Sequence, residues 1–431
     1  LPGNVDSLFT AVANRYTHIV APDGESIPLL IQDDFTLDQI IHVRKILESC
    51  LEDIPNSELG SDKTLIANSI VSTNAILFLL NNENEYSNPH LQALFDAGVI
   101  GQNLLATEVF PEGSIDYMNS TGRDVSYERV LHFIHTYGIQ LAAPGIQSMI
   151  NNAMEQAIED EYYQPLSNLS ADDYDERYFA MGLESYFGLW GHDPNGDGYC
   201  GEHEYAFDNR NAMLDGDPLL FDIVEGFFGS MWNYTATLPE YHEGNFYLFF
   251  VDSLFYTHRS QYLKNVSLSG TGLGSLYGNI YVNELSGNSG DNILKGFEGD
   301  DRINGGEGTD RAIYVGSRED YVIIPPHVTD DSSYQVIDLI PDRDGTDYLW
   351  EIEEIEFNGV VFHVGDLLVN NIKCFTTRPD TLFGFSFLAV SADHEISKFY
   401  KDNIDFLKFK EECSKTGTTE EAIAVGEKIG F

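Results

Sequence analysis

Oxygen-bearing side chains recur at nine-residue intervals between Gly278 and Ile313, a spacing that suits repeated cation binding. Written in nines, the segment reads GNIYVNELS, GNSGDNILK, GFEGDDRIN and GGEGTDRAI. In three of the four units the fourth place carries a turn-forming glycine: Gly290, Gly299 and Gly308. The sixth place carries Asn or Asp in every unit: Asn283, Asn292, Asp301 and Asp310. The eighth place carries an apolar residue: Leu285, Leu294, Ile303 and Ala312. The pattern predicts one turn and one short strand per unit, with turn oxygens binding Ca²⁺. A glycine-rich linker is the alternative, but linkers lack phased Asp and Leu.

A second set of residues has the types that bind zinc. Glu128, His132 and His135 lie at i, i+4 and i+7 of a helix expected over 124–138, within an arc of about 60° on one face. One carboxylate and two imidazoles can hold Zn²⁺ and leave a position for water. The alternative is a polar stripe or a pair of hydrogen-bonded histidines.

The segment HDPNGDGYCGEHE offers a third set, rich in oxygen donors. Its donors occupy places 1, 3, 5, 7 and 12 of the twelve-residue stretch 193–204: Asp193, Asn195, Asp197, Tyr199 and Glu204. This spacing resembles an EF-hand loop and predicts a calcium site that locks structure. A solvated acidic turn is the alternative.

The nonapeptide segment as a whole resembles the RTX (hemolysin-type) calcium-binding repeat of secreted bacterial proteins. In that family a calcium ion lies between turns two repeats apart. The resemblance therefore implies that Asn283 pairs with Asp301 and that Asn292 pairs with Asp310. It also implies an extracellular location.

The segment RYFAMGLESYFG, over 177–188, resembles the helix that supplies the third zinc ligand in lethal-factor-like and Mlc-titration-factor-like peptidases. Glu184 matches the second acidic place of that pattern, but Arg177 stands at the ligand glutamate and the HExxH signature is absent. Two hypotheses follow. In one, the domain is a divergent zinc peptidase with Zn²⁺ on Glu128, His132, His135 and Glu184, and Glu128 and Glu184 are catalytic. In the other, it is a non-catalytic extracellular binding or adhesion protein in which calcium is structural.

The last 60 residues carry a different resemblance. The stretch TTRPDTLFG is similar to bacterial leucyl-tRNA synthetase at the start of its editing domain, with matches at Thr376, Thr377, Arg378, Asp380 and Thr381. The ATP motifs of the catalytic domain are absent, so aminoacylation is not expected and the editing motif is predicted to be non-functional. A fusion of reading frames, natural or from sequence assembly, is the simplest hypothesis. It would displace the C-terminal export signal that the RTX resemblance implies.

The charge balance constrains the partners. There are 23 basic and 70 acidic side chains, giving a net charge of -47, which argues against nucleic acid and for divalent cations. No apolar run has the length of a membrane span. We expect Ca²⁺, with Zn²⁺ in the peptidase hypothesis, and an extracellular protein or peptide as the partner.

The expected fold is a multidomain α+β chain. A mainly helical metallohydrolase-like domain is predicted for 1–265, and a short parallel RTX β-roll for 266–315. A β-rich cap, with Asp344 and Asp347 in an RDGTD turn, is predicted for 316–370 because a solenoid needs an end cover. A short α/β synthetase-like fragment is predicted for 371–431.

Overall fold

A computed structural model describes residues 7–190, 199–201, 203–326, 333–367 and 404–415. The chain divides into two compact units, Leu1–Asp366 and Leu367–Phe431. In the second unit, residues 404–415 form the helix α14 (Ile404–Lys415). The first unit holds both helices and strands, as the sequence predicts for an α+β chain, and carries every candidate site that the structure describes.

The N-terminal part is built on a four-stranded sheet of order β1-β2-β3-β4. An antiparallel hairpin joins β1 (Arg15–Val20) to β2 (Ser26–Ile31), and β3 (Ile76–Leu80) and β4 (Gly101–Leu105) continue the sheet in parallel. Every residue of β3 is buried, as expected for an unbroken apolar run in a strand covered on both faces. The sheet supports the helices that carry the titratable groups.

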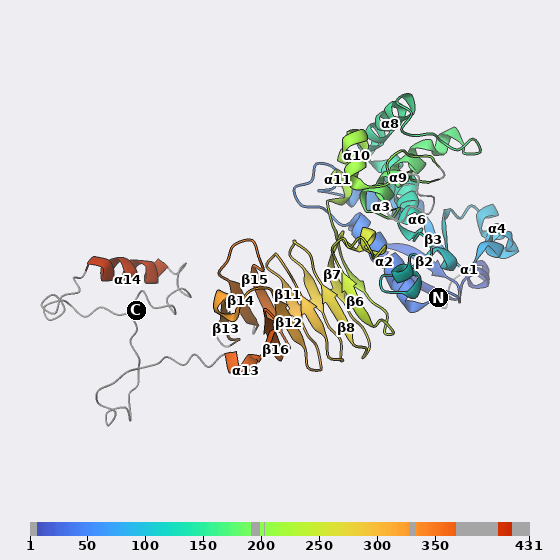
Figure 1. The fold of residues 1–431 in the computed structure, drawn as a ribbon. Helices are drawn as coiled ribbons and strands as arrows, with labels where there is room; N and C mark the ends of the chain where they lie inside the picture. The colour runs from blue at the N-terminus through green and yellow to red at the C-terminus, as the bar shows by residue number, and fades with distance from the viewer. Residues whose placement is uncertain (1–6, 191–198, 202, 327–332, 368–403, 416–431) are drawn as a thin grey trace, which may run out of the picture. The chain divides into compact units, whose positions relative to one another are not determined.

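Helices surround this sheet and bring distant segments together (Figure 1). The capping box of Thr36 and Gln39 starts α2 (Leu37–Leu51), which packs against α6 (Ser126–Ile134). Helix α6 continues into a π-helical turn, His135–Ile139, and packs against α9 (Tyr174–Tyr186). The other main helices are α3 (Thr64–Thr73), α4 (Pro89–Asp96), α5 (Ile115–Asn119), α8 (Pro144–Glu159), α10 (Arg210–Gly216) and α11 (Pro218–Phe228).

The nonapeptide repeats form a parallel β-roll in which successive strands alternate between two sheets (Figure 1). One sheet contains β5 (Trp232–Thr237), β7 (Leu263–Ser267), β9 (Glu284–Ser286), β11 (Arg302–Asn304) and β15 (Thr346–Trp350). The other contains β6 (Gly244–Tyr247), β8 (Gly274–Tyr277), β10 (Ile293–Lys295), β12 (Arg311–Tyr314) and β16 (Glu354–Phe357). Antiparallel strands extend each sheet: β13 (Tyr321–Ile324), β14 (Tyr334–Asp338) and β17 (Val360–His363).

The apolar eighth residues fill the space between the two sheets. Leu285, Leu294, Ile303 and Ala312 are all buried. Leu285 lies opposite Ile303 and Leu294 opposite Ala312, so residues 18 apart in sequence stack in register. Because each unit contributes one strand, two units complete one turn of the roll.

The parallel strands extend beyond the four repeats in both directions. They begin at Trp232, within the range predicted for the N-terminal domain, and reach Phe357, within the range predicted for the cap. Strand β5 lacks the glycine signature but alternates buried and exposed residues, which is enough to place one face against the core. The repeat signature thus marks only the middle of the roll.

Candidate functional site: the β-roll and the buried ion clusters

The structure brings together the residues that the repeat pattern pairs. The Asn283 backbone N–H donates to Asp301 Oδ1 at 2.8 Å, and the Asn292 N–H donates to Asp310 Oδ1 at 2.7 Å. These two pairs belong to two separate stacks of turns, and each stack precedes the strands of one of the two sheets. Each sixth residue thus contacts the sixth residue of the unit 18 positions away.

In Asp301 and Asp310, the Oδ1 atom accepts a hydrogen bond but the Oδ2 atom does not. Asp301 Oδ2 and Asp310 Oδ2 are buried without a hydrogen-bond partner in the protein, and both residues are 0% exposed. Burial raises the pKa of Asp301 to about 8 and that of Asp310 to about 6. A buried carboxylate oxygen without a donor is destabilising unless a cation compensates it. The oxygen-rich surroundings of these two groups fit Ca²⁺, a hard cation.

The two asparagines are already satisfied by the protein. Asn283 Oδ1 accepts from the Asn279 N–H at 2.7 Å, and its Nδ2 donates to the Lys264 carbonyl at 2.9 Å. Asn292 Oδ1 accepts from the Asn288 N–H at 2.8 Å. These hydrogen bonds close the turns without any carboxylate. Among the sixth-place residues of the four repeats, only Asp301 and Asp310 therefore offer a negative charge to a cation.

The fourth-place glycines allow the turns to stack. Gly299 and Gly308 both have φ of +127°, a conformation that side chains disfavour. A Cβ would lie 2.7 Å from the Tyr281 carbonyl oxygen at Gly299 and 2.8 Å from the Gly290 carbonyl oxygen at Gly308. Backbone carbonyls of one turn therefore face the next turn, beside the aspartates.

The predicted zinc ligands do not form one site. Glu128 Oε1 accepts from Arg177 at 2.8 Å and its Oε2 accepts from Arg123 at 2.7 Å. Glu184 also binds Arg123 and accepts from the indole N–H of Trp190 at 2.8 Å. Although burial opposes ionisation, the guanidinium groups of Arg123 and Arg177 lower the pKa of Glu128 to about 2. Both carboxylates are paired with arginine.

The two histidines have different partners from Glu128 and Glu184. His132 Nδ1 lies 3.1 Å from Glu176, and the buried ring of His135 lies 4.0 Å from carboxylate oxygens of Asp175 and Glu176. Burial lowers the pKa of His132. Among the described residues, no group of three His, Cys, Asp or Glu side chains could hold a metal ion. The zinc prediction is therefore not supported, because cations from α9 and the loop before α6 occupy its acidic ligands.

The predicted loop site at 193–204 lies only partly within the residues that the structure describes. Asp193, Asn195 and Asp197 lie outside the described residues, and Tyr199 and Glu204 lie within them. Glu204 is 1% exposed and accepts two hydrogen bonds from Arg177, at 2.8 and 3.2 Å. Its carboxylate thus has a guanidinium partner in the protein. The editing-like residues Thr376, Thr377, Arg378, Asp380 and Thr381 also lie outside the described residues.

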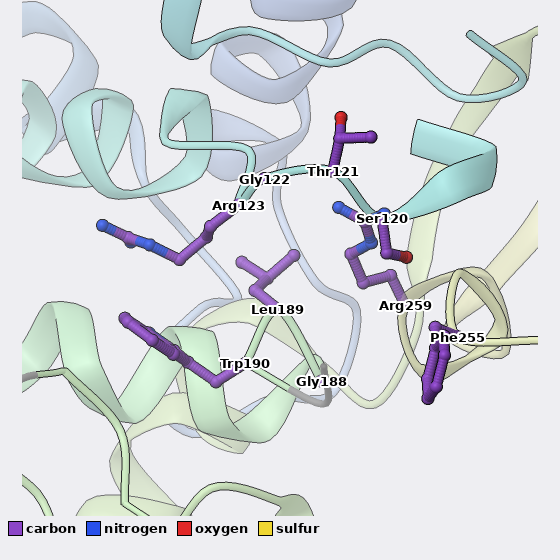
Figure 2. A pocket seen from close by; sticks show the side chains of 9 residues that line it. All are labelled: Ser120, Thr121, Gly122, Arg123, Gly188, Leu189, Trp190, Phe255 and Arg259. Carbon is purple, nitrogen blue, oxygen red and sulfur yellow. The ribbon is translucent and has the colours of Figure 1, made fainter. Parts of the chain in front are cut away.

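A small pocket of about 110 Å³ is lined in part by Arg123, the partner of Glu128 and Glu184 (Figure 2). Arg123 lies over the Trp190 ring in its wall, with 4.9 Å between guanidinium carbon and ring centroid. Arg259 lies near Ser120, donates to the Tyr117 carbonyl at 2.9 Å and stacks on the Tyr117 ring. None of the four predicted zinc ligands lines this pocket.

A buried ion triad was not predicted from the sequence. His42 on α2 lies between two carboxylates, with Nδ1 2.9 Å from Glu112 and Nε2 2.6 Å from Asp124. Tyr234, on the first strand of the roll, donates to Glu112 at 2.6 Å, so the triad joins the helices to the roll. The three charged residues are far apart in sequence, and no spacing rule connects them.

The triad predicts how stability depends on pH. Burial opposes the charge on His42, yet Glu112 and Asp124 raise its pKa to about 10. Stabilisation by the imidazolium is complete below the ordinary value of 6.5 and is lost as pH rises through about 10. Burial opposes the ionisation of Glu112 as well, but His42 lowers its pKa to about 2, so its contribution is complete above 4.5 and is lost as pH falls through about 2. We expect the wild-type protein to have a higher denaturant midpoint than a His42→Gln variant. The difference between the two midpoints should be largest between pH 4.5 and 6.5 and smaller near pH 10. A difference independent of pH would contradict this charge state.

Comparison with known protein families identifies two segments. Residues 277–312 match the RTX calcium-binding nonapeptide repeat (4 copies). Residues 353–431 match the leucyl-tRNA synthetase editing domain, and the first of these residues belong to strands β16 and β17 of the roll. The RTX match supports calcium binding and an extracellular location.

Leucine–tRNA ligases are similar to a short part of the chain. The leucine–tRNA ligase of Roseobacter denitrificans is 51% identical over 63 residues, which is 14% of this chain and 7% of that protein. The leucine–tRNA ligase of Gluconobacter oxydans is 47% identical over 64 residues, 15% of this chain and 7% of that protein. The chain thus spans about 7% of the length of these relatives.

Proposed function

We propose that this protein is a secreted RTX protein that binds Ca²⁺ in its β-roll and whose N-terminal domain has a binding role rather than a catalytic one. The observation that carries the calcium site is the pair of buried oxygens, Asp301 Oδ2 and Asp310 Oδ2, without protein partners. When bound, Ca²⁺ supplies the positive charge that these carboxylates lack. Asp301 and Asp310 would hold the ion together with backbone carbonyls of the stacked turns.

The buried ion pairs favour the non-catalytic hypothesis over the zinc peptidase. Activation of a metal-bound water requires a carboxylate that can accept a proton. Glu128 and Glu184 are each bound to arginine, and a pKa of about 2 makes Glu128 a poor base near neutral pH. We infer that the helix pair α6 and α9 keeps a scaffold in which ion pairs replace the metal. The partner of such a domain would be an extracellular protein or peptide.

The synthetase-like segment has no role in this proposal. Its relatives are ligases of which this chain covers about 7%. Among the described parts of the chain, no helix has the length and apolar character of a membrane span.

Metal analysis tests this proposal directly. We expect protein purified without chelator to contain calcium and no stoichiometric zinc, and we expect Asp301→Asn to lower calcium content. A chelator should reduce the β-structure signal in circular dichroism, because the stacked carboxylates then repel one another. Asp366→Asn, which changes an exposed aspartate beyond the last roll strand, is the matched control. A full zinc complement that is lost in His132→Ala would refute the non-catalytic hypothesis, and a chain without calcium would refute the calcium site.

A further inference from the structure

The turn before β15 repeats the last nonapeptide unit in sequence and in hydrogen bonding. The residues Gly345-Thr346-Asp347 are identical in type to Gly308-Thr309-Asp310. The Thr309 N–H donates to Asp291 Oδ1 at 2.8 Å, and the Thr346 N–H donates to Asp300 Oδ1 at 2.9 Å. Asp291 and Asp300 both occupy the fifth place of their units. The cap therefore resumes the turn of the repeat.

The ladder of sixth residues continues into this turn. The Asp301 N–H donates to Asp347 Oδ1 at 3.0 Å, just as the Asn283 N–H donates to Asp301 Oδ1 at 2.8 Å. Leu349 lies opposite Ile303 and is fully buried, which is the environment of an eighth-place residue. Asp347 thus occupies the sixth place of a further unit, 46 residues after Asp301 instead of 18.

The second ladder continues in the same way. The Asp310 N–H donates to Glu353 Oε2 at 2.9 Å. Ile355 lies opposite Ala312 and is fully buried, so Glu353 stands two residues before an eighth-place residue, as Asp310 does. The intervening chain forms the antiparallel strands β13 and β14, which add to the edge of one sheet. An insertion therefore separates the four repeats from two further units of the same roll.

We propose that two more Ca²⁺ sites lie at this junction, one between Asp301 and Asp347 and one between Asp310 and Glu353. Each joins an aspartate whose Oδ2 is buried and unpartnered to a second carboxylate. The proposal rests on calcium binding by the roll, but it assigns ligands outside the four matched repeats.

Charge makes these the stronger sites. A site between two carboxylates offers a divalent cation twice the negative charge of an Asn–Asp site, and ligand charge is a main determinant of calcium affinity. The neighbouring Asp344 has partners within the protein, because its Oδ2 accepts from the Tyr321 hydroxyl and from the Val315 N–H at 3.0 Å. Calcium bound at the junction would tie the cap to the repeats.

The test uses the full chain stripped of metal and titrated with CaCl₂. We expect Asp347→Asn and Glu353→Gln each to remove one calcium from the stoichiometry measured by calorimetry. We also expect each to raise the calcium midpoint for the gain of β-structure by about tenfold or more. The matched control is Asp342→Asn, which removes the same charge from an exposed place in the same turn and should leave both values unchanged.

The outcomes separate the two proposals. Wild-type protein that binds no calcium refutes calcium binding by the roll itself. Wild-type protein that binds calcium, with both variants keeping its stoichiometry and midpoint, refutes the junction sites alone. A variant that is unfolded at low calcium but folds at high calcium supports the junction sites, because only the midpoint has moved. Folding loss that calcium does not reverse, seen in both variants, would show a structural role for these carboxylates and would also refute the sites.

Discussion

Replacing His42 with alanine should lower the free energy of unfolding by about 3–5 kcal/mol, because it leaves two buried carboxylates without their cation. Glu112 and Asp124 lie 2.9 and 2.6 Å from the imidazole, and all three side chains are almost inaccessible to water. The loss should also weaken the packing of β5, since Glu112 holds Tyr234. Denaturant unfolding at saturating calcium, followed by tryptophan fluorescence, measures the effect.

Two variants control this experiment. His90→Ala removes an exposed imidazole and should change stability by no more than about 0.5 kcal/mol. The double variant Glu112→Gln with His42→Ala removes one of the stranded charges and should recover part of the loss. A His42→Ala protein as stable as the His90→Ala protein would show that the triad contributes no net stability.

Replacing Arg177 with methionine should also cost about 3–5 kcal/mol of unfolding free energy. Its guanidinium binds Glu128 at 2.8 Å and Glu204 at 2.8 Å, and both carboxylates are buried. Glu128 keeps Arg123 as a partner, so Glu204 should be the more destabilised of the two groups. Adding Glu204→Gln to Arg177→Met should therefore restore a large share of the stability. Chemical denaturation of the single and double variants measures this coupling.

The contrast with a surface ion pair makes this prediction specific. Arg44 and Glu48 are 2.9 Å apart on α2, but both side chains are 45% exposed, so Arg44→Met should cost only about 0.3–0.5 kcal/mol. An equal effect of the two methionine variants would refute the structural role of Arg177. If Glu204→Gln alone lowered calcium content, Glu204 would be a calcium ligand, as the loop spacing predicts, rather than only a partner of Arg177.

The roll was predictable because its information is local and periodic. Glycine, Asp or Asn, and Leu or Ile recur every nine residues, so a single register places turns and core together. The family resemblance then implied the pairing of Asn283 with Asp301, and the structure places these residues in direct contact. The continuation at Asp347 was harder to recognise, because 46 residues rather than 18 separate it from Asp301. Only the GTD repetition marks it in the sequence.

The helical site was not predictable in the same way. Helical spacing correctly selects residues that share α6, but it does not say what faces them from other helices. Arg177 on α9 and Arg123 before α6 reach Glu128, whereas Glu176 reaches His132. The sequence shows that Arg177 replaces the ligand glutamate of the peptidase pattern. Only the packing of α9 against α6 shows that this arginine pairs with Glu128. The separation of Glu128 and Glu184 from the histidines was decided by those contacts.

By itself, the sequence determined the calcium-binding repeat, the acidic character of the chain and the C-terminal similarity to leucyl-tRNA synthetase. Each of these depends on residues close together in the chain or on total composition. Tertiary structure decided which buried carboxylates have a partner. Glu112, Asp124, Glu128 and Glu184 are paired with His42 or arginine, while Asp301 and Asp310 each keep one oxygen without a donor. The physical reason is that the cost of a buried charge depends on its nearest neighbours in space, and folding brings those neighbours from distant parts of the chain.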